Sequence, residues 1–251
     1  MSLLAADEPG PVELLRGAAG ARFLLTADHA GRAIPRGLMD LGVSAAERAR
    51  HIAWDIGIAG VTRRLSALLE VPAVLQHYSR LVIDCNRPPH VAGAFPEVSE
   101  ATAIPGNVGL GEAAKAERRA AIFEPYHAAI AQEIEALGPV IYVAMHSFTP
   151  VYLGQARAMH VGVLYNRNPR FSRALAELLR AEPGLKVEEN EPYRVSDESD
   201  YGVPVHAERR GLDYVEIEIR QDLIQDEAGQ AEWAGRLARL LPLAADRLSG
   251  T

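Results

Sequence analysis

The sequence predicts an α/β fold: a three-layer sandwich in which a mixed, mostly parallel sheet carries helices on both faces. Short aliphatic segments alternate with longer segments of helical periodicity, which is the pattern of a parallel sheet with covering helices. One aliphatic segment, 212–220, alternates Val215, Ile217 and Ile219 with charged residues, as a strand does. Apolar residues make up 48% and charged residues 24% of the 251 residues, which suits one large domain over residues 1–251.

The first elements are expected to be short strands on either side of a long helix. Residues 1–20 are expected to form an irregular lead-in, with a short helix near Val12–Gly17. Ser44 and Glu47 fit a capping box, which predicts that the long helix begins there and runs to Leu69. Strands are expected at Arg22–Ala27, Ala73–His77 and Arg80–Cys85.

The rest of the chain continues the alternation after a long irregular stretch. Residues 86–110 are rich in proline and glycine, and so long an irregular stretch usually lines or covers a site. A helix over Gly111–Leu137 is expected to be kinked or broken at Pro125. The further strands are expected at Pro139–Met145, Val161–Tyr165, Leu185–Glu189 and 212–220, and the further helices at Phe171–Arg180, Val203–Arg210 and Ala228–Arg247.

Composition excludes several classes of protein. The formal charge of −7, without a basic stripe, argues against nucleic-acid binding. No apolar run is long enough to span a bilayer, and the N-terminus lacks a signal-peptide pattern, so we expect no membrane partner. The sole cysteine, Cys85, cannot form an internal disulfide, which fits a cytoplasmic protein. An oligomer is compatible with this sequence.

Polar residues follow several of the predicted strands. His29, Asn86 and His146 each come at or just after a strand end, and ligands of parallel sheets bind beyond these ends. A hydrolytic zinc site usually has three protein ligands, so a third ligand is needed. Asp55 lies in an apolar stretch and requires a buried partner, whereas His51 would share its helical face. The alternatives are histidines that merely stabilise turns and an Asp55–arginine ion pair.

The strand 212–220 presents Glu216, Glu218 and Arg220 on one face. If the strand is buried, a metal site or a bound substrate would have to meet these charges. An edge strand with one solvated face is the alternative.

A cluster of polar residues surrounds the aliphatic segment 80–85. Asn86 and Arg87 are suited to holding a substrate carboxylate, and Arg80 to holding either a carboxylate or an oxyanion. An Arg80–Asp84 ion pair within the fold is the simpler interpretation for Asp84. Tyr193, in a turn, is a further candidate for substrate binding. No G-x-S-x-G motif supports a serine hydrolase, and Cys85 has no neighbouring base.

Taken in order, these motifs resemble those of the N-formylglutamate amidohydrolase family. The segments that carry the resemblance are Asp28–Gly31, Trp54–Gly57, Ser79–Arg87, Met145–Ser147, Asn190–Tyr193 and Glu218–Arg220. The wider similarity is to zinc-dependent exopeptidases and aspartoacylases, which implies a zinc-exopeptidase-like fold. It also implies a metal-dependent amidohydrolase of amino-acid catabolism that acts on linear amides. The substrate would be a small acidic N-acyl amino acid, with N-formyl-L-glutamate, cleaved to glutamate and formate, as the leading candidate.

The resemblance also implies roles for individual residues. A divalent cation, zinc in first place with iron and manganese also compatible, would bind His29, Asp55 and His146. Glu218 would be the general base in preference to Glu216, and Arg80 would stabilise the oxyanion. Asn86, Arg87, Tyr193 and Arg220 would contact the substrate.

The sequence departs from these relatives at two positions. Metallocarboxypeptidases have a glutamate three residues after the first histidine, where this chain has Arg32. Asp55 as the third ligand is therefore an inference. Ala30 stands where many members have serine, which leaves open another N-acyl amino acid or a peptide end as substrate. A non-catalytic binding protein with a decayed site is the remaining alternative.

Overall fold

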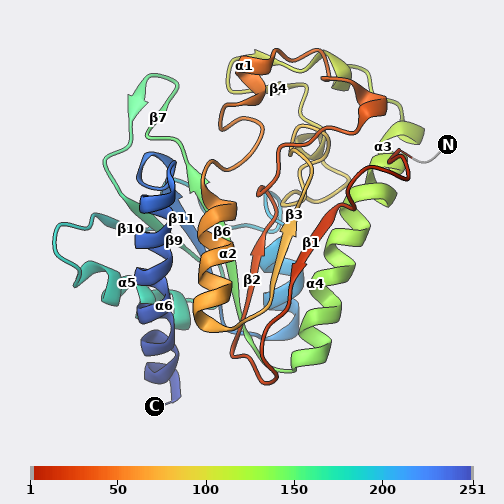
Figure 1. Ribbon diagram of the computed structural model, residues 1–251. Helices are drawn as coiled ribbons and strands as arrows, with labels where there is room; N and C mark the ends of the chain where they lie inside the picture. Colours follow the sequence, from red (N-terminus) through yellow and green to blue (C-terminus); the bar gives the residue numbers. More distant parts are fainter. Residues whose placement is uncertain (1–2, 250–251) are drawn as a thin grey trace.

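The computed structural model describes residues 3–249 and places a seven-stranded mixed sheet at the centre (Figure 1). The strand order is β1-β3-β2-β6-β11-β9-β10. Neighbouring strands are parallel except for the pairs β1/β3 and β9/β11, which are antiparallel. The predicted fold class is therefore confirmed. The strands are β1 (Val12–Leu15), β2 (Phe23–Ala27), β3 (Ala73–Gln76), β6 (Ile141–Phe148), β9 (Val161–Leu164), β10 (Val187–Glu189) and β11 (Tyr214–Arg220).

Helices cover both faces of this sheet (Figure 1). Helices α2 (Ile58–Leu69), α5 (Arg170–Arg180) and α6 (Glu227–Ser249) pack on one face, and α4 (Glu124–Leu137) packs on the other. The alternation in β11 decides which side chains enter which layer. Val215, Ile217 and Ile219 join the apolar core under α2, α5 and α6. Glu216 and Glu218 therefore point to the opposite face, where they are buried.

The prediction of one long helix from Ser44 to Leu69 is wrong. Ser44 does cap a helix, because its Oγ accepts a hydrogen bond from the Glu47 amide at 3.2 Å, but α1 covers only Ala45–Arg48. The next helix, α2, begins at Ile58 after Gly57, which has a φ of +83°. A Cβ at Gly57 would lie 2.0 Å from the Ile224 carbonyl oxygen, so a glycine is required there. Residues 49–57 are thus irregular, and His51 and Asp55 do not share a helical face.

Two shorter elements also differ from expectation. The segment near Val12–Gly17 contains strand β1 and no helix. The segment Arg80–Cys85 forms turns and no strand. Its carbonyl groups are paired with side chains instead: Asn107 Nδ2 donates to Leu81 O at 2.9 Å, and Arg118 donates to Val82 O at 2.9 Å. The hydrogen bonds that a neighbouring strand would have made are therefore provided by polar side chains.

The region 112–137 is helical throughout, in three consecutive pieces. Helix α3 (Glu112–Arg118) passes through a π-helical turn, η4 (Arg119–Phe123), into α4. Pro125 lies just after this π-helical turn, and the helix continues past it, so the proline does not break the helix and the irregularity lies in the turn before it. The region expected to be a helix at Val203–Arg210 is a π-helical turn, η5 (Val203–Ala207), followed by a 3₁₀ turn, η6 (Glu208–Arg210).

Irregular segments and two small hairpins gather where β2, β6 and β11 end (Figure 1). One hairpin joins β4 (Val98–Ser99) to β5 (Thr102–Ala103), and the other joins β7 (Val151–Tyr152) to β8 (Gln155–Ala156). The remaining 3₁₀ turns are η1 (Arg36–Leu38), η2 (Ala92–Ala94), η3 (Pro105–Asn107) and η7 (Gln221–Leu223). Within residues 3–249, no helix is long and apolar enough to cross a membrane.

Candidate active site

A cavity of about 510 Å³ opens at this end of the sheet. Its lining comes from seven separate segments of the chain, around residues 29, 51–55, 80–87, 99–100, 146–157, 192–200 and 216–218. Nearly all of the predicted site residues line it: His29, His51, Asp55, Arg80, Asn86, Arg87, His146, Tyr193 and Glu218. Glu216 lines it too, whereas Arg220 does not. The convergence expected of the strand ends is therefore present.

The centre of the cavity lies over the adjacent strands β6 and β11. Glu218 and His146 are register partners in this parallel pair, so their side chains lie side by side on one face. Both are at least 95% buried. One carboxylate oxygen of Glu218, Oε2, and one of Glu216, Oε2, have no hydrogen-bond partner within residues 3–249. Two free carboxylate oxygens therefore lie at the sheet face beneath the cavity.

Burial changes the acidity of these two carboxyl groups. Removal from water disfavours their charged form and raises the pKa of Glu218 to about 8, although the neighbouring His146 opposes the shift. The pKa of Glu216 is raised well above its usual range for the same reason. A carboxyl with a pKa near neutrality is suited to exchanging protons at physiological pH.

Two imidazoles and an aspartate meet beside Glu218. His29 follows β2, and its Nδ1 lies 3.6 Å from Asp55 Oδ1. His146 Nδ1 lies 3.2 Å from the other Asp55 oxygen, Oδ2. Asp55 is fixed by the backbone, because its amide donates to the His29 carbonyl oxygen at 2.9 Å and its Oδ2 accepts from the Ser147 amide at 3.0 Å. The carboxylate thus lies between the Nδ1 atoms of the two imidazoles.

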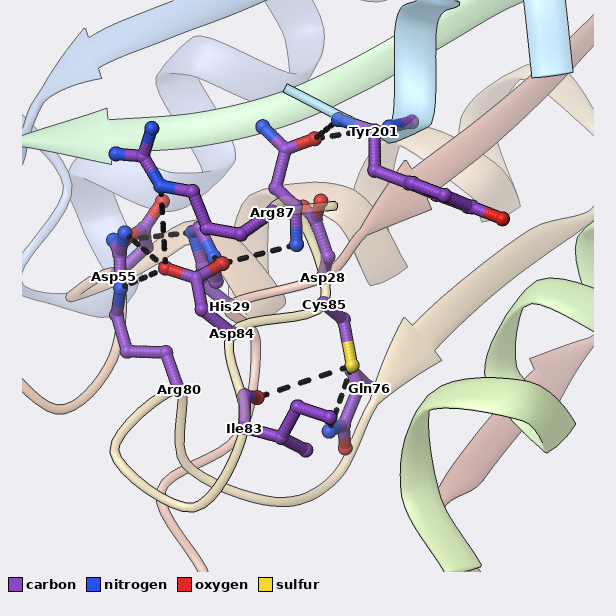
Figure 2. Close-up of polar contacts among 12 residues, drawn as sticks. Asp28, His29, Asp55, Gln76, Arg80, Ile83, Asp84, Cys85, Arg87 and Tyr201 are labelled. Atoms are coloured by element: carbon purple, nitrogen blue, oxygen red, sulfur yellow. Dashed lines mark hydrogen bonds and ion pairs between the residues drawn. The ribbon is translucent and has the colours of Figure 1, made fainter. Parts of the chain in front are cut away.

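Two further aspartates lie beside the opposite nitrogens of the same rings. Asp84 Oδ1 lies 2.7 Å from His29 Nε2 (Figure 2). Asp28 Oδ1 lies 3.1 Å from His146 Nε2. Surrounding carboxylates, with Asp84 the strongest, raise the pKa of His29 to about 9 against the opposing effects of burial and Arg80. The site is therefore rich in negative charge and attracts a cation.

Asp84 also holds Arg80, as the sequence suggested. Figure 2 shows the Asp84 carboxylate between the Arg80 guanidinium and the His29 ring. Arg80 donates to Asp84 Oδ2 from Nε at 3.1 Å and from a terminal nitrogen at 2.6 Å. Its other terminal nitrogen lies 3.5 Å from Asp55 Oδ1. Although burial opposes it, this pairing raises the pKa of Arg80 and lowers that of Asp84 well below its usual range.

The residues present fit a metal ion. Asp28, His29 and His146 can each offer one ligand atom within 4.8 Å of the others. His29 Nδ1, His146 Nε2 and Asp28 Oδ1 are buried and form no hydrogen bond with the described part of the chain. The geometry therefore adds Asp28, which the sequence did not single out as a ligand, to the candidates. An aspartate beside a strand-end histidine looks like an ordinary turn residue.

The remaining sequence candidates have distinct positions. Asn86 is largely occupied by the backbone, since its Oδ1 accepts from the amides of Tyr201 and Gly202 at 3.2 and 3.0 Å. Arg87 donates to the Ser199 carbonyl oxygen at 2.7 Å. His51 lines the cavity away from the two imidazoles, with its Nε2 3.6 Å from Glu100 Oε2.

Arg220 does not reach the cavity. Its guanidinium pairs with Asp222 at 2.8 Å and donates to the carbonyl oxygens of residues 157–159. The expectation that Arg220 contacts substrate therefore finds no support in its position. At the carboxyl end of β11 the chain turns into η7 (Gln221–Leu223), and Asp222 within this turn pairs with the Arg220 guanidinium.

Comparison with known proteins identifies the family. The family model of N-formylglutamate amidohydrolase matches residues 21–225. A crystal structure of a gene product from Agrobacterium tumefaciens is 37% identical, with a TM-score of 0.94 over 98% of this chain and 99% of the other. This chain belongs to the N-formylglutamate amidohydrolase family. Family membership indicates amidohydrolase chemistry and agrees with the resemblance seen in the sequence.

More distant structures share the fold of this family member. An N-formylglutamate amidohydrolase from Ralstonia eutropha is 20% identical, with a TM-score of 0.71 over 97% of this chain and all of the other. A bacteriophage poly-gamma-glutamate hydrolase is 10% identical, with a TM-score of 0.50 over 98% and 93%. A search of curated proteins found no match.

Proposed function

We propose that this protein hydrolyses the amide bond of a small N-acyl amino acid in a metal-dependent reaction, with N-formyl-L-glutamate as the leading substrate. One observation supports this most: Glu218, with a free carboxylate oxygen, is the register partner of His146 at the base of a cavity that His29 and Asp55 also line. A general base beside a nitrogen- and carboxylate-rich cation site is the arrangement required for metal-assisted hydrolysis.

His29 Nδ1, His146 Nδ1 and Asp55 would hold the cation. Asp55 lines the cavity and faces both Nδ1 atoms, whereas Asp28 lies outside the cavity lining. In this arrangement Asp84, hydrogen-bonded to His29 Nε2, would orient that ring, and Asp28, with its Oδ1 3.1 Å from His146 Nε2, would do the same for His146 once that nitrogen carries a proton. The bound cation, zinc in first place, would lower the pKa of a water and polarise the scissile carbonyl.

Glu218 would take a proton from the attacking water and deliver it to the leaving nitrogen. Its pKa of about 8 lets the carboxyl exchange protons near neutral pH. Arg80, which Asp84 holds in place, would stabilise the oxyanion, and removal of one such donor typically costs about 3–4 kcal/mol. Arg87 would bind the α-carboxylate of the substrate, with Asn86 positioning the loop beside it.

Substitution of the base tests this assignment. We expect E218Q to lose formate release from N-formyl-L-glutamate by at least about 100-fold, while its zinc content by elemental analysis stays at the wild-type level. Parallel assays with N-acetyl- and N-succinyl-L-glutamate identify the preferred acyl group. Near-wild-type turnover by E218Q would refute the role of Glu218.

Substitution of the two aspartates tests the ligand set. D55N should abolish stoichiometric zinc binding, because it removes a direct ligand. D28N should retain the metal with an affinity lowered by about 10–100-fold, as expected for a residue that only orients a ligand. The reverse outcome would show that Asp28 and His146 Nε2, and not Asp55 and His146 Nδ1, bind the metal.

A further inference from the structure

A further arginine, Arg157, enters the cavity from the β7–β8 hairpin. It follows β8 directly and lines the same cavity as His29, His146 and Glu218. The hairpin stands out from the strand ends at the edge of the molecule (Figure 1). Arg157 is thus anchored on a different segment from Arg80 and Arg87.

Aromatic rings fix the position of the Arg157 guanidinium. Its central carbon lies 4.8 Å from the ring centre of Tyr152, 5.1 Å from that of Tyr193 and 5.7 Å from that of Phe148. One terminal nitrogen donates a hydrogen bond to the Tyr193 hydroxyl at 3.1 Å. Stacking on rings leaves the in-plane N–H groups of a guanidinium free, and these are the groups that recognise a carboxylate.

The charges around the cavity distinguish Arg157 from its neighbours. Arg80 pairs with Asp84 and Asp55, and Arg87 is bonded to the Ser199 carbonyl oxygen. Arg157, by contrast, has no carboxylate within ion-pair distance anywhere in residues 3–249. A preorganised cation without a counter-charge, in a cavity large enough for a small metabolite, is a ready acceptor for an anionic group.

We propose that Arg157, supported by Tyr152 and Tyr193, binds the side-chain carboxylate of the substrate and makes the enzyme selective for N-acyl derivatives of acidic amino acids. The inference rests on the proposed function, because it assigns the second carboxylate of a substrate whose amide lies over Glu218 and whose α-carboxylate lies at Arg87. Arg157 then determines the choice between a dicarboxylate and a neutral amino acid of the same size.

The test compares two substrates that differ by one charge: N-formyl-L-glutamate and its neutral isostere N-formyl-L-glutamine. R157Q should lower kcat/KM for the glutamate compound by roughly 10- to 100-fold, the range for a lost hydrogen bond to a charged group. It should change kcat/KM for the glutamine compound by less than about threefold, because a neutral amide gains little from the cation. R157K, which keeps the charge but loses the fork, should fall between wild type and R157Q.

Arg32 provides a matched control. Its guanidinium lies 5.1 Å from the Trp54 ring centre, but it does not line the cavity. R32Q should therefore leave kcat/KM unchanged for both substrates. Arg194, an exposed arginine that does line the cavity, is the competing candidate. If R194Q and not R157Q removes the preference for N-formyl-L-glutamate, the inference is overturned.

A binding measurement separates this inference from the proposed reaction. Calorimetry in the inactive E218Q background should show that R157Q weakens binding of N-formyl-L-glutamate by roughly 10-fold or more, with little change for N-formyl-L-glutamine. If wild type cleaves neither compound but this binding difference is present, the proposed reaction fails and the Arg157 subsite stands. If wild type cleaves N-formyl-L-glutamate and R157Q keeps the same substrate preference, the subsite fails and the reaction stands. If the E218Q protein binds neither compound, the subsite fails as well.

Discussion

Replacing Asp84 by asparagine should destabilise the protein substantially, even without metal. The two Asp84 oxygens accept four hydrogen bonds: Oδ1 from His29 Nε2 at 2.7 Å and from the Asn86 amide at 2.9 Å, and Oδ2 from Arg80 at 3.1 and 2.6 Å. An asparagine has only one acceptor oxygen. Its amide nitrogen would face donors on one side, and Arg80 would lose its closest counter-charge.

The expected magnitude follows from these contacts. Hydrogen bonds to a charged group contribute about 1.5–3 kcal/mol each, and removing one partner of a buried ion pair costs about 3–5 kcal/mol. Asp84 is 97% buried. We therefore expect D84N to lower the free energy of unfolding by about 3–5 kcal/mol, which is a drop of roughly 10 °C in Tm for a chain of this size.

The pH dependence gives a second check on the same residue. The folded-state pKa of Asp84 lies well below its unfolded value of about 3.9. Its contribution is therefore complete above the unfolded pKa and is lost only as the pH falls through the lower folded-state pKa. The difference between wild type and D84N should be constant from pH 6 to 8 and should shrink below about pH 4.

Urea unfolding in the presence of chelator measures the effect without a contribution from bound metal. D246N is a suitable control, because Asp246 also pairs with an arginine, Arg22, but at the surface. Such a pair contributes about 0–1 kcal/mol. An unfolding free energy for D84N within about 1 kcal/mol of wild type would refute the view that Asp84 neutralises a buried cation.

Three further perturbations have defined outcomes. Burial lowers the pKa of His206 to about 3, so its contribution to stability is complete above the unfolded pKa of about 6.5 and is lost below it. Lowering the pH from 7 to 5 should cost wild type up to about 2 kcal/mol more than H206N in urea titrations, and equal pH slopes would contradict this. G162A should lower both stability and turnover, because its Cβ would lie 2.0 Å from the Glu191 carbonyl oxygen and 3.4 Å from the Glu218 Cβ. The control is G235A, at an exposed helical position with open space around it, which should raise stability by about 0.5–1 kcal/mol. Equal Tm values for the two variants would contradict this account of the packing at Gly162. Removing the metal with chelator should lower the Tm of wild type, and adding zinc should restore it. The rise in Tm should grow with zinc concentration in wild type, and D55N should show no such rise.

The alternation of residues in β11 could be predicted from the sequence because it follows directly from strand geometry. Any strand that places Ile217 and Ile219 under helices must place Glu216 and Glu218 on the opposite face. The sequence could not provide the register that brings Glu218 beside His146, since these partners are 72 positions apart in the chain (218 − 146). The positions of polar residues at strand ends suggested that these residues converge at one edge of the sheet. The pairing of β6 with β11 is what makes Glu218 and His146 neighbours.

The errors arose where long-range contacts override local preference. Helical periodicity continues through residues 49–56, but Gly57 adopts a positive φ against Ile224, which is distant in sequence. The aliphatic residues Leu81, Val82 and Ile83 resemble a strand, yet they are buried in a turn. The carbonyl groups of this turn are bonded by Asn107 and Arg118, and no local pattern encodes those partners.

The irregular segment that replaces the predicted helix is what brings Asp55 to the imidazoles. In a continuous helix, the Asp55 amide would bond within the helix, whereas here it donates to the His29 carbonyl oxygen. Ser147, next to His146, donates from its amide to Asp55 Oδ2 and from its hydroxyl to Ile56 O at 2.9 Å. The segment is therefore joined by hydrogen bonds to the two elements that carry the histidines. Asp55, the carboxylate that the proposed function assigns to the cation, is thus positioned by these backbone attachments without a helical motif.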